Sequence, residues 1–158
     1  MASVTLALNY SGDHQLTPFN IAVPTFRVPN LDRGSPPIAL ANWRGKPIVL
    51  NLWGSWCPPC EAEMPALEAA HRQLGNRVVF VGIDEYDQKD AALSFLHKVG
   101  TTYAIGFDPS GQVAAMFGSP GTPTTVFISK EGREIDYHQG PFTEGDLLND
   151  VNQLFGID

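Results

Sequence analysis

The stretch that decides the fold is 50–60, which reads LNLWGSWCPPC. It begins inside an apolar run, as expected for a strand that is buried on both faces of a parallel sheet. Pro58 and Pro59 suit the first turn of a helix, where a missing N–H costs no helical hydrogen bond. The sequence therefore predicts a strand, a short turn and a helix start, with both cysteines of the protein, Cys57 and Cys60, at the junction.

The spacing of the two cysteines favours redox chemistry. Thiols three residues apart can close a small disulfide ring, and the thiolate is the attacking species in disulfide exchange. Cys57 precedes the helix, where free N–H groups and the helix dipole stabilise a thiolate, so we expect a solvent-facing Cys57 to attack and a more buried Cys60 to resolve. Because Pro58 and Pro59 have no N–H, any backbone donor to the Cys57 sulfur must come from Cys60 or beyond.

Two other uses of the cysteines are weaker. A structural zinc site normally takes four protein ligands. The chain has two cysteines, and its four histidines are scattered without ligand spacing: His14, His71, His97 and His138. A purely structural disulfide would close a very small loop and stabilise little. We therefore expect no metal and no cofactor other than the redox-active disulfide.

Length and charge limit the class of protein. A chain of 158 residues fits one domain with its own core, and a net charge of −7 argues against a nucleic-acid partner. No apolar run reaches the roughly 18 residues of a membrane span. Residues 1–10 lack the basic and apolar regions of a signal peptide, so the protein is either cytoplasmic or has lost an export signal or anchor. We expect a flexible N-terminal extension over 1–20 and one domain over 21–158.

Hydrophobic periodicity predicts alternating strands and helices along the rest of the chain. The expected strands are 48–53, 78–83, 103–107, 124–128 and 134–138, and the expected helices are 58–74, 88–99, 112–117 and one that begins at 143. Strands joined through helices run parallel, and the tight turn at 130–133 makes the last pair antiparallel. The fold class is therefore α/β, a mixed sheet with helices on both faces. Extended pieces at 25–28 and 37–40 predict an N-terminal β-hairpin.

Acidic side chains also follow the second predicted strand. Asp84 and Glu85 could line the rim of the site, although we favour solvated loop charges. Asp87 is expected to cap the helix over 88–99. Glu61 and Glu68 are expected to be solvated carboxylates of the first helix.

Residues 51–65, NLWGSWCPPCEAEMP, resemble the thioredoxin superfamily, and within it the TlpA/ResA/CcmG-like branch. Further matches are ANWRGKP at 41–47, FDPSG at 107–111, FGSPGTPTT at 117–125 and ISKEG at 128–132. The resemblance covers about residues 24–155. It implies a thioredoxin-like three-layer fold with a central mixed sheet, an N-terminal β-hairpin and a βα insertion that ends with the helix over 88–99.

The resemblance also implies roles for residues around the cysteines. It places Thr122 and Pro123 at the cis-proline that lies beside the active site and pairs with substrate backbone. Trp56 would cover Cys57 and, with the neighbouring Pro58 and Pro59, offer a surface to substrates.

A glutamate follows the second cysteine by three residues. In ResA-like proteins a carboxylate at the position of Glu63 tunes the cysteines and moves protons. Physically, a carboxylate near two thiols raises their pKa values, and burial raises its own pKa, which makes it a usable acid or base. The alternative is a solvated helix carboxylate. Asn51 stands where classical thioredoxins have a buried aspartate, and an amide cannot shuttle protons.

The function that the resemblance implies is a thiol–disulfide oxidoreductase that cycles Cys57 and Cys60 between dithiol and disulfide. Its substrates would be protein disulfides or thiols, such as the haem-binding cysteines of apocytochrome c during cytochrome c maturation. It would be a monomeric reductant in the periplasm or at the outer face of the cytoplasmic membrane, supplied with electrons by a membrane donor. The alternative location is cytoplasmic.

Three alternatives to a reductant remain open. An oxidant or isomerase of exported proteins would use the same residues, because the redox potential depends on thiolate stabilisation. A peroxiredoxin-like thiol peroxidase shares the fold, but its peroxidatic site requires Thr-x-x-Cys, and this chain has Gly54 at the threonine position. The third alternative is a non-catalytic binding module.

Overall fold

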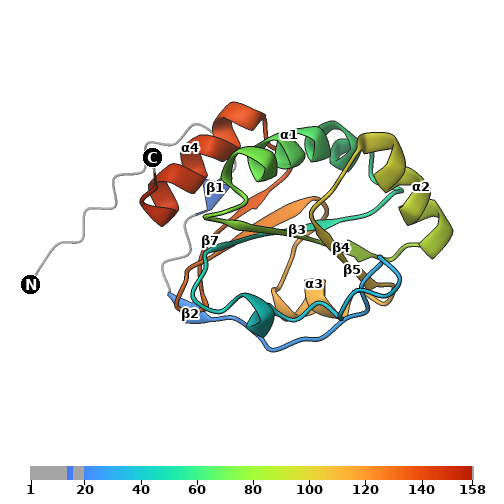
Figure 1. Ribbon diagram of the computed structural model, residues 1–158, viewed down its shortest axis with the longest axis horizontal. Helices are drawn as coiled ribbons and strands as arrows, with labels where there is room; N and C mark the ends of the chain where they lie inside the picture. The colour runs from blue at the N-terminus through green and yellow to red at the C-terminus, as the bar shows by residue number, and fades with distance from the viewer. Residues whose placement is uncertain (1–13, 16–19, 158) are drawn as a thin grey trace, which may run out of the picture.

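The computed structural model describes residues 14–15 and 20–157. Seven strands form one sheet around which the helices pack (Figure 1). The strands are β1 (His14–Gln15), β2 (Ile21–Ala22), β3 (Ile48–Trp53), β4 (Val79–Glu85), β5 (Ala104–Asp108), β6 (Thr124–Ile128) and β7 (Arg133–Gln139). The helices are the 3₁₀-helix η1 (Leu40–Trp43), α1 (Pro58–Leu74), α2 (Lys89–Val99), α3 (Gln112–Met116) and α4 (Glu144–Phe155).

The sheet is mixed, with β3 at its centre. Its order is β1-β7-β6-β3-β4-β5, and β2 also pairs with β7. Strands β3, β4 and β5 run parallel, as expected for strands joined through helices. The same rule is wrong for β6, which follows α3 but pairs antiparallel with β3. The chain enters β6 from the loop at the carboxyl edge of β3, so β6 must run back across the sheet.

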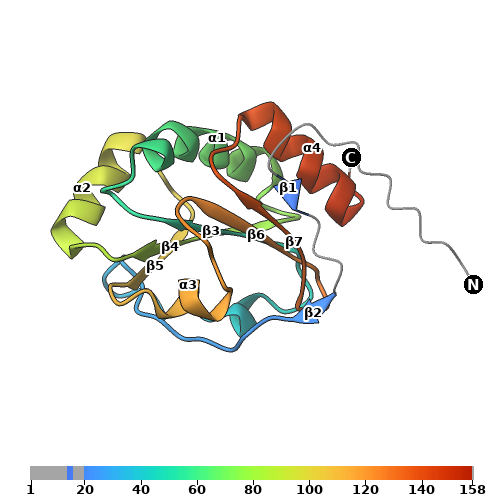
Figure 2. The same ribbon diagram turned by 180° about the vertical axis from the view of Figure 1, so that it is seen from behind.

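Helices cover both faces of the sheet, which confirms the three-layer expectation. Helices α1, α2 and α4 lie on one face, and α3 with η1 and the chain around it lies on the other (Figures 1 and 2). Alternate side chains of β3 enter the two cores: Leu50 joins the α3 side, and Trp53 joins the α1 side. A strand buried on both faces is therefore almost entirely apolar. Among the described residues, none of the helices is both long and apolar enough to cross a bilayer.

The expected N-terminal hairpin is reduced to one antiparallel bridge. Val28 and Ile38 exchange two backbone hydrogen bonds of 3.0 and 2.8 Å. Pro29, Pro36 and Pro37 flank this bridge and have no N–H to extend a ladder.

The expected extension over 1–20 falls mostly outside the described residues. Within it, His14–Gln15 form β1, which pairs antiparallel with β7.

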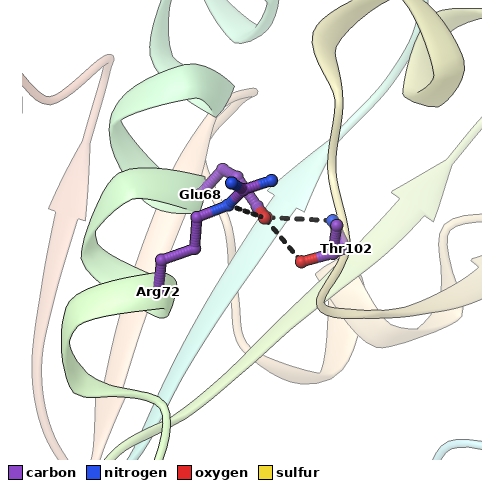
Figure 3. Close-up of polar contacts among 3 residues, drawn as sticks. All are labelled: Glu68, Arg72 and Thr102. Carbon is purple, nitrogen blue, oxygen red and sulfur yellow. Dashed lines mark hydrogen bonds and ion pairs between the residues drawn. The ribbon is translucent and has the colours of Figure 1, made fainter.

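Glu68 is buried, which corrects its expected place in solvent. Its carboxylate accepts hydrogen bonds from the backbone N and Oγ1 of Thr102 (2.9 and 2.5 Å) and from Arg72 Nε at 3.0 Å (Figure 3). Burial alone would raise the pKa of Glu68, but these hydrogen bonds outweigh it and lower the pKa. The contacts attach the loop before β5 to α1. Glu61, by contrast, is half-exposed and forms an ion pair with Lys98.

Candidate active site

Cys57 and Cys60 form a disulfide at the start of α1. Cys57 is the N-cap residue, with extended backbone angles, and its Sγ accepts a hydrogen bond of 3.3 Å from the backbone N of Cys60. The prediction that the donor must lie at Cys60 or beyond is confirmed. The helix N-terminus therefore directs an N–H group at the sulfur expected to carry negative charge in the reduced form.

Both sulfur-bearing side chains are buried in the disulfide form. Cys57 is 3% exposed and Cys60 is 1% exposed. The expectation of a solvent-facing Cys57 is wrong for this form, because the bond holds its side chain against Cys60 within the core cluster below α1. Cys60 is more buried than Cys57, as expected, but their exposed fractions differ little.

The indole of Trp56 lies over Gly54. A Cβ at position 54 would come within 2.3 Å of Trp56 Nε1, so only glycine fits beneath the ring. The same Nε1 donates a hydrogen bond of 3.0 Å to the backbone carbonyl of Glu85. The ring is 51% exposed, so it presents a fixed aromatic surface beside Cys57. Trp53, in contrast, is fully buried, as expected for a core residue.

Asp87 holds the turn that carries the disulfide, instead of capping α2. Its carboxylate accepts hydrogen bonds from the backbone N of Ser55 at 2.6 Å and from Ser55 Oγ at 2.8 Å. The N-cap of α2 is Gln88, whose backbone N also donates to Asp87 at 2.7 Å. Tyr86 has a positive φ of 53°, which turns the chain so that Asp87 faces Ser55. The cap prediction is wrong because the Asp87 carboxylate binds Ser55, 32 positions away, and α2 has no side-chain cap.

Asp84 and Glu85 belong to β4 and are buried, which corrects their expected place as solvated loop charges. Asp84 is fully buried, and burial and the neighbouring Asp87 raise its pKa to about 9. Burial would also raise the pKa of Asp87, but the donors of Ser55 and Gln88 outweigh it and lower that pKa. Among the described residues, no group of three or more histidine, cysteine or acidic side chains is arranged to hold a metal ion.

Glu63 lies on α1 one turn after Cys60 and is fully buried, so the solvated alternative is wrong. Asn51 Nδ2 donates to its Oε1 at 2.9 Å, and Thr125 Oγ1 lies at 3.5 Å from the same oxygen. Its Oε2 has no hydrogen-bond partner among the described residues. Burial raises the pKa of Glu63 to about 8, although these donors oppose the rise. A carboxyl group that titrates near neutral pH can exchange protons during a reaction.

The peptide bond between Thr122 and Pro123 is cis, as predicted. Thr122 Oγ1 donates a hydrogen bond of 2.5 Å to Glu85 Oε1, so Glu85 contacts both Trp56 and the cis-proline loop. Pro58 and Pro59 are exposed on the first turn of α1.

The structure thus brings together all the predicted site segments and adds three carboxylates that sequence reasoning assigned elsewhere. Asp84 and Glu85 are the last two residues of the buried strand β4, and Asp87 follows them in the same short acidic run. That run was the signal that could have identified them, because parallel strands place their carboxyl ends at the edge that carries the site.

A disulfide at a helix N-terminus, a cis-proline loop and a three-layer sheet define the thioredoxin-like class. The Redoxin family model matches residues 20–155, and the chain belongs to this family, in its TlpA/ResA/CcmG-like branch. A thiol:disulfide interchange protein DsbE homolog of Paracoccus denitrificans is 39% identical over 102 residues, which are 64% of this chain and 55% of the relative. The thiol-disulfide oxidoreductase ResA of Bacillus thuringiensis subsp. konkukian is 31% identical over 127 residues, 78% of this chain and 71% of the relative.

Solved structures give the same result. A DsbF homologue from Corynebacterium diphtheriae has a TM-score of 0.80 and 30% identity, with 89% of this chain and 92% of that chain covered. A secreted Mycobacterium tuberculosis disulfide oxidoreductase homologous to Escherichia coli DsbE has a TM-score of 0.72 and 28% identity, with 81% and 95% covered. The chain spans 55–61% of the length of the DsbE relatives that it matches in Paracoccus and Xylella.

Proposed function

We propose that this protein is a thiol–disulfide oxidoreductase that acts on the disulfides and thiols of other proteins through Cys57 and Cys60. The observation that carries the proposal is the Cys60 N–H directed at Cys57 Sγ, at the end of a helix. In the reduced protein this donor would stabilise the Cys57 thiolate, which is the attacking species.

The reaction consists of two exchanges. The Cys57 thiolate attacks one sulfur of a substrate disulfide, forming a mixed disulfide, and the second substrate sulfur leaves as a thiolate that takes up a proton. The Cys60 thiol then loses its proton and attacks Cys57, which breaks the mixed disulfide and releases the other substrate sulfur. Two electrons pass from the cysteine pair to the substrate, and the Cys57–Cys60 disulfide forms. In the reverse direction the same steps oxidise a dithiol.

Glu63 is the group that we assign to the proton of Cys60. It lies one turn after Cys60, it has an oxygen without a hydrogen-bond partner among the described residues, and its pKa of about 8 is close to that of an ordinary thiol. Asn51 donates to the other oxygen and keeps the carboxyl group in place.

We place the protein outside the cytoplasm as a monomeric reductant that a membrane donor supplies with electrons. The similarity to a secreted disulfide oxidoreductase of Mycobacterium tuberculosis supports the location. The branch resemblance supports the reducing direction and a substrate such as the cysteines of apocytochrome c. Reduction potential is the measurement that separates this role from that of an oxidant or isomerase.

The test is turnover of insulin disulfides with dithiothreitol as electron donor, followed by equilibration of the Cys57–Cys60 pair with glutathione. Activity should be lost in Cys57→Ser, and unchanged turnover would contradict an enzymatic role. A potential near the approximately −270 mV of thioredoxin supports a reductant, whereas one near the approximately −120 mV of DsbA supports an oxidant.

One structural observation opposes a peroxidase of the Thr-x-x-Cys type. Any side chain at position 54 would collide with the indole of Trp56, so a threonine does not fit there without moving the ring. We therefore expect hydrogen peroxide consumption to be negligible beside disulfide turnover.

A further inference from the structure

Glu85 connects two segments that flank the disulfide and are far apart in the sequence. Its backbone carbonyl accepts the indole N–H of Trp56 at 3.0 Å, across 29 positions. Its side-chain Oε1 accepts the hydroxyl of Thr122 at 2.5 Å, across 37 positions. One residue therefore fixes the aromatic ring before Cys57 and the residue before the cis-proline.

The position of Glu85 is costly for a carboxylate. The residue is 1% exposed, and its Oε2 has no hydrogen-bond partner among the described residues. Asp108 lies opposite it in β5 and adds a like charge. Burial, together with Asp108, raises the pKa of Glu85, although Thr122 opposes the rise. Burying an apolar side chain at this strand end would cost less free energy than burying a carboxyl group. The contact with Thr122 therefore explains why a glutamate stands here.

We propose that Glu85 is a positioning residue that fixes the distance between Trp56 and the Thr122 loop, and so sets the fit of a polypeptide substrate across the disulfide. The inference rests on the proposed function. Strand β4 is the rigid element in this arrangement, since it pairs on both sides, with β3 and with β5. Trp56 is bound to the backbone of this strand, and Thr122 is bound to its last side chain.

A protein disulfide is flanked by chain on both sides of its cysteine, so it meets Trp56 and the Thr122 loop together. A small disulfide presents little beyond its sulfurs. Loss of the Glu85–Thr122 contact should therefore weaken binding of a protein substrate more than that of a small one. Because a hydrogen bond of this kind contributes about 0.5–1.5 kcal/mol net, the KM for a protein disulfide should rise roughly two- to ten-fold.

The experiment compares Glu85→Leu, Thr122→Val and the double variant, with insulin and with bis(hydroxyethyl) disulfide as substrates. Each single variant should raise the KM for insulin roughly two- to ten-fold and change the KM for the small disulfide by a smaller factor. The double variant should be no worse than the single ones, because both remove the same contact. Glu85→Gln keeps an acceptor oxygen and should restore the insulin KM to within two-fold of wild type.

The matched control is Glu134→Gln, which changes another buried glutamate, on β7, whose pKa is also raised by burial. It should leave both KM values unchanged. Additive effects in the double variant, or equal effects on the two substrates, would overturn the positioning role. If Glu85→Leu fails to fold, Thr122→Val and Glu85→Gln still decide the question. Inactivity of the wild-type protein toward insulin would instead count against the proposed function itself.

Discussion

Asn51 Nδ2 and Glu63 Oε1 form a buried hydrogen bond of 2.9 Å between the central strand and the helix that carries Cys60. An amide thus occupies the strand position, and the titrating carboxyl group belongs to the helix. Asn51 also donates to Thr125 Oγ1 at 3.1 Å, so its amide hydrogen-bonds within the core. Glu63, whose pKa is about 8, is therefore the titrating member of this pair.

Replacing Glu63 with glutamine should change how stability depends on pH. The pKa of Glu63 is about 8 in the folded protein and 4.5 as its ordinary value. Between these two pH values the unfolded chain ionises while the folded protein stays protonated, so wild-type stability falls as pH rises. In urea denaturation of the disulfide form, the free energy of unfolding of Glu63→Gln should rise relative to that of wild type between pH 4.5 and 8. The rise should be on the order of a few kcal/mol.

The control for this experiment is Glu61→Gln on the same helix. Glu61 is half-exposed and paired with Lys98, so its variant should give a pH profile parallel to that of wild type. A parallel profile for Glu63→Gln as well would show that Glu63 is ionised in the folded protein at neutral pH.

Asp84→Asn should remove a second pH-dependent loss of stability. The pKa of Asp84 rises from its ordinary 3.8 to about 9, so the stability present below pH 3.8 is lost as pH rises toward 9. An asparagine amide is neutral at every pH, as the protonated Asp84 side chain is. The unfolding free energy of Asp84→Asn should therefore exceed that of wild type at pH 9, with a smaller difference at pH 5. A variant less stable than wild type at pH 9 would contradict the raised pKa of Asp84.

Gly54→Ala should displace the indole of Trp56, because its Cβ would lie 2.3 Å from Nε1. We expect the Trp56 indole N–H resonance to move as its bond to Glu85 is lost, and insulin turnover to fall several-fold. The matched change is Gly145→Ala in α4, where no atom lies within 4 Å of an added Cβ. That variant should stabilise the protein by about 0.5–1 kcal/mol and leave the Trp56 resonance in place. An unmoved Trp56 resonance in Gly54→Ala would show that the ring does not depend on glycine beneath it.

The sequence predicted the parts of the fold that local pattern determines. The strand at 48–53 and the helix at 58–74 have the predicted bounds, because an all-apolar run and two prolines after a cysteine leave few alternatives. The direction of β6 was not predictable from its connection through α3. The five-residue α3 is too short to return the chain to the amino ends of the parallel strands, where a parallel β6 would have to begin.

The site residues that a spacing motif defines were predicted from the sequence. Those whose place depends on tertiary contacts were missed. Cys57, Cys60 and the cis-proline at Pro123 follow from motifs. Glu85 was assigned to solvent because of its charge, and Asp87 to a helix cap because of its position. Their partners are 37 and 32 positions away, at Thr122 and Ser55 respectively. Contacts between residues so far apart leave no local pattern in the sequence.

The different roles of the two cysteines are the central claim, and trapping of a mixed disulfide tests them most directly. Cys60→Ser and Cys57→Ser are each reduced and mixed with an oxidised protein substrate, and covalent adducts are identified by non-reducing mass spectrometry. Cys60→Ser should accumulate a mixed disulfide through Cys57, because attack proceeds and resolution is blocked, while Cys57→Ser should accumulate little. Adducts that form through Cys60 in Cys57→Ser, with none in Cys60→Ser, would contradict the assignment of Cys57 as the nucleophile.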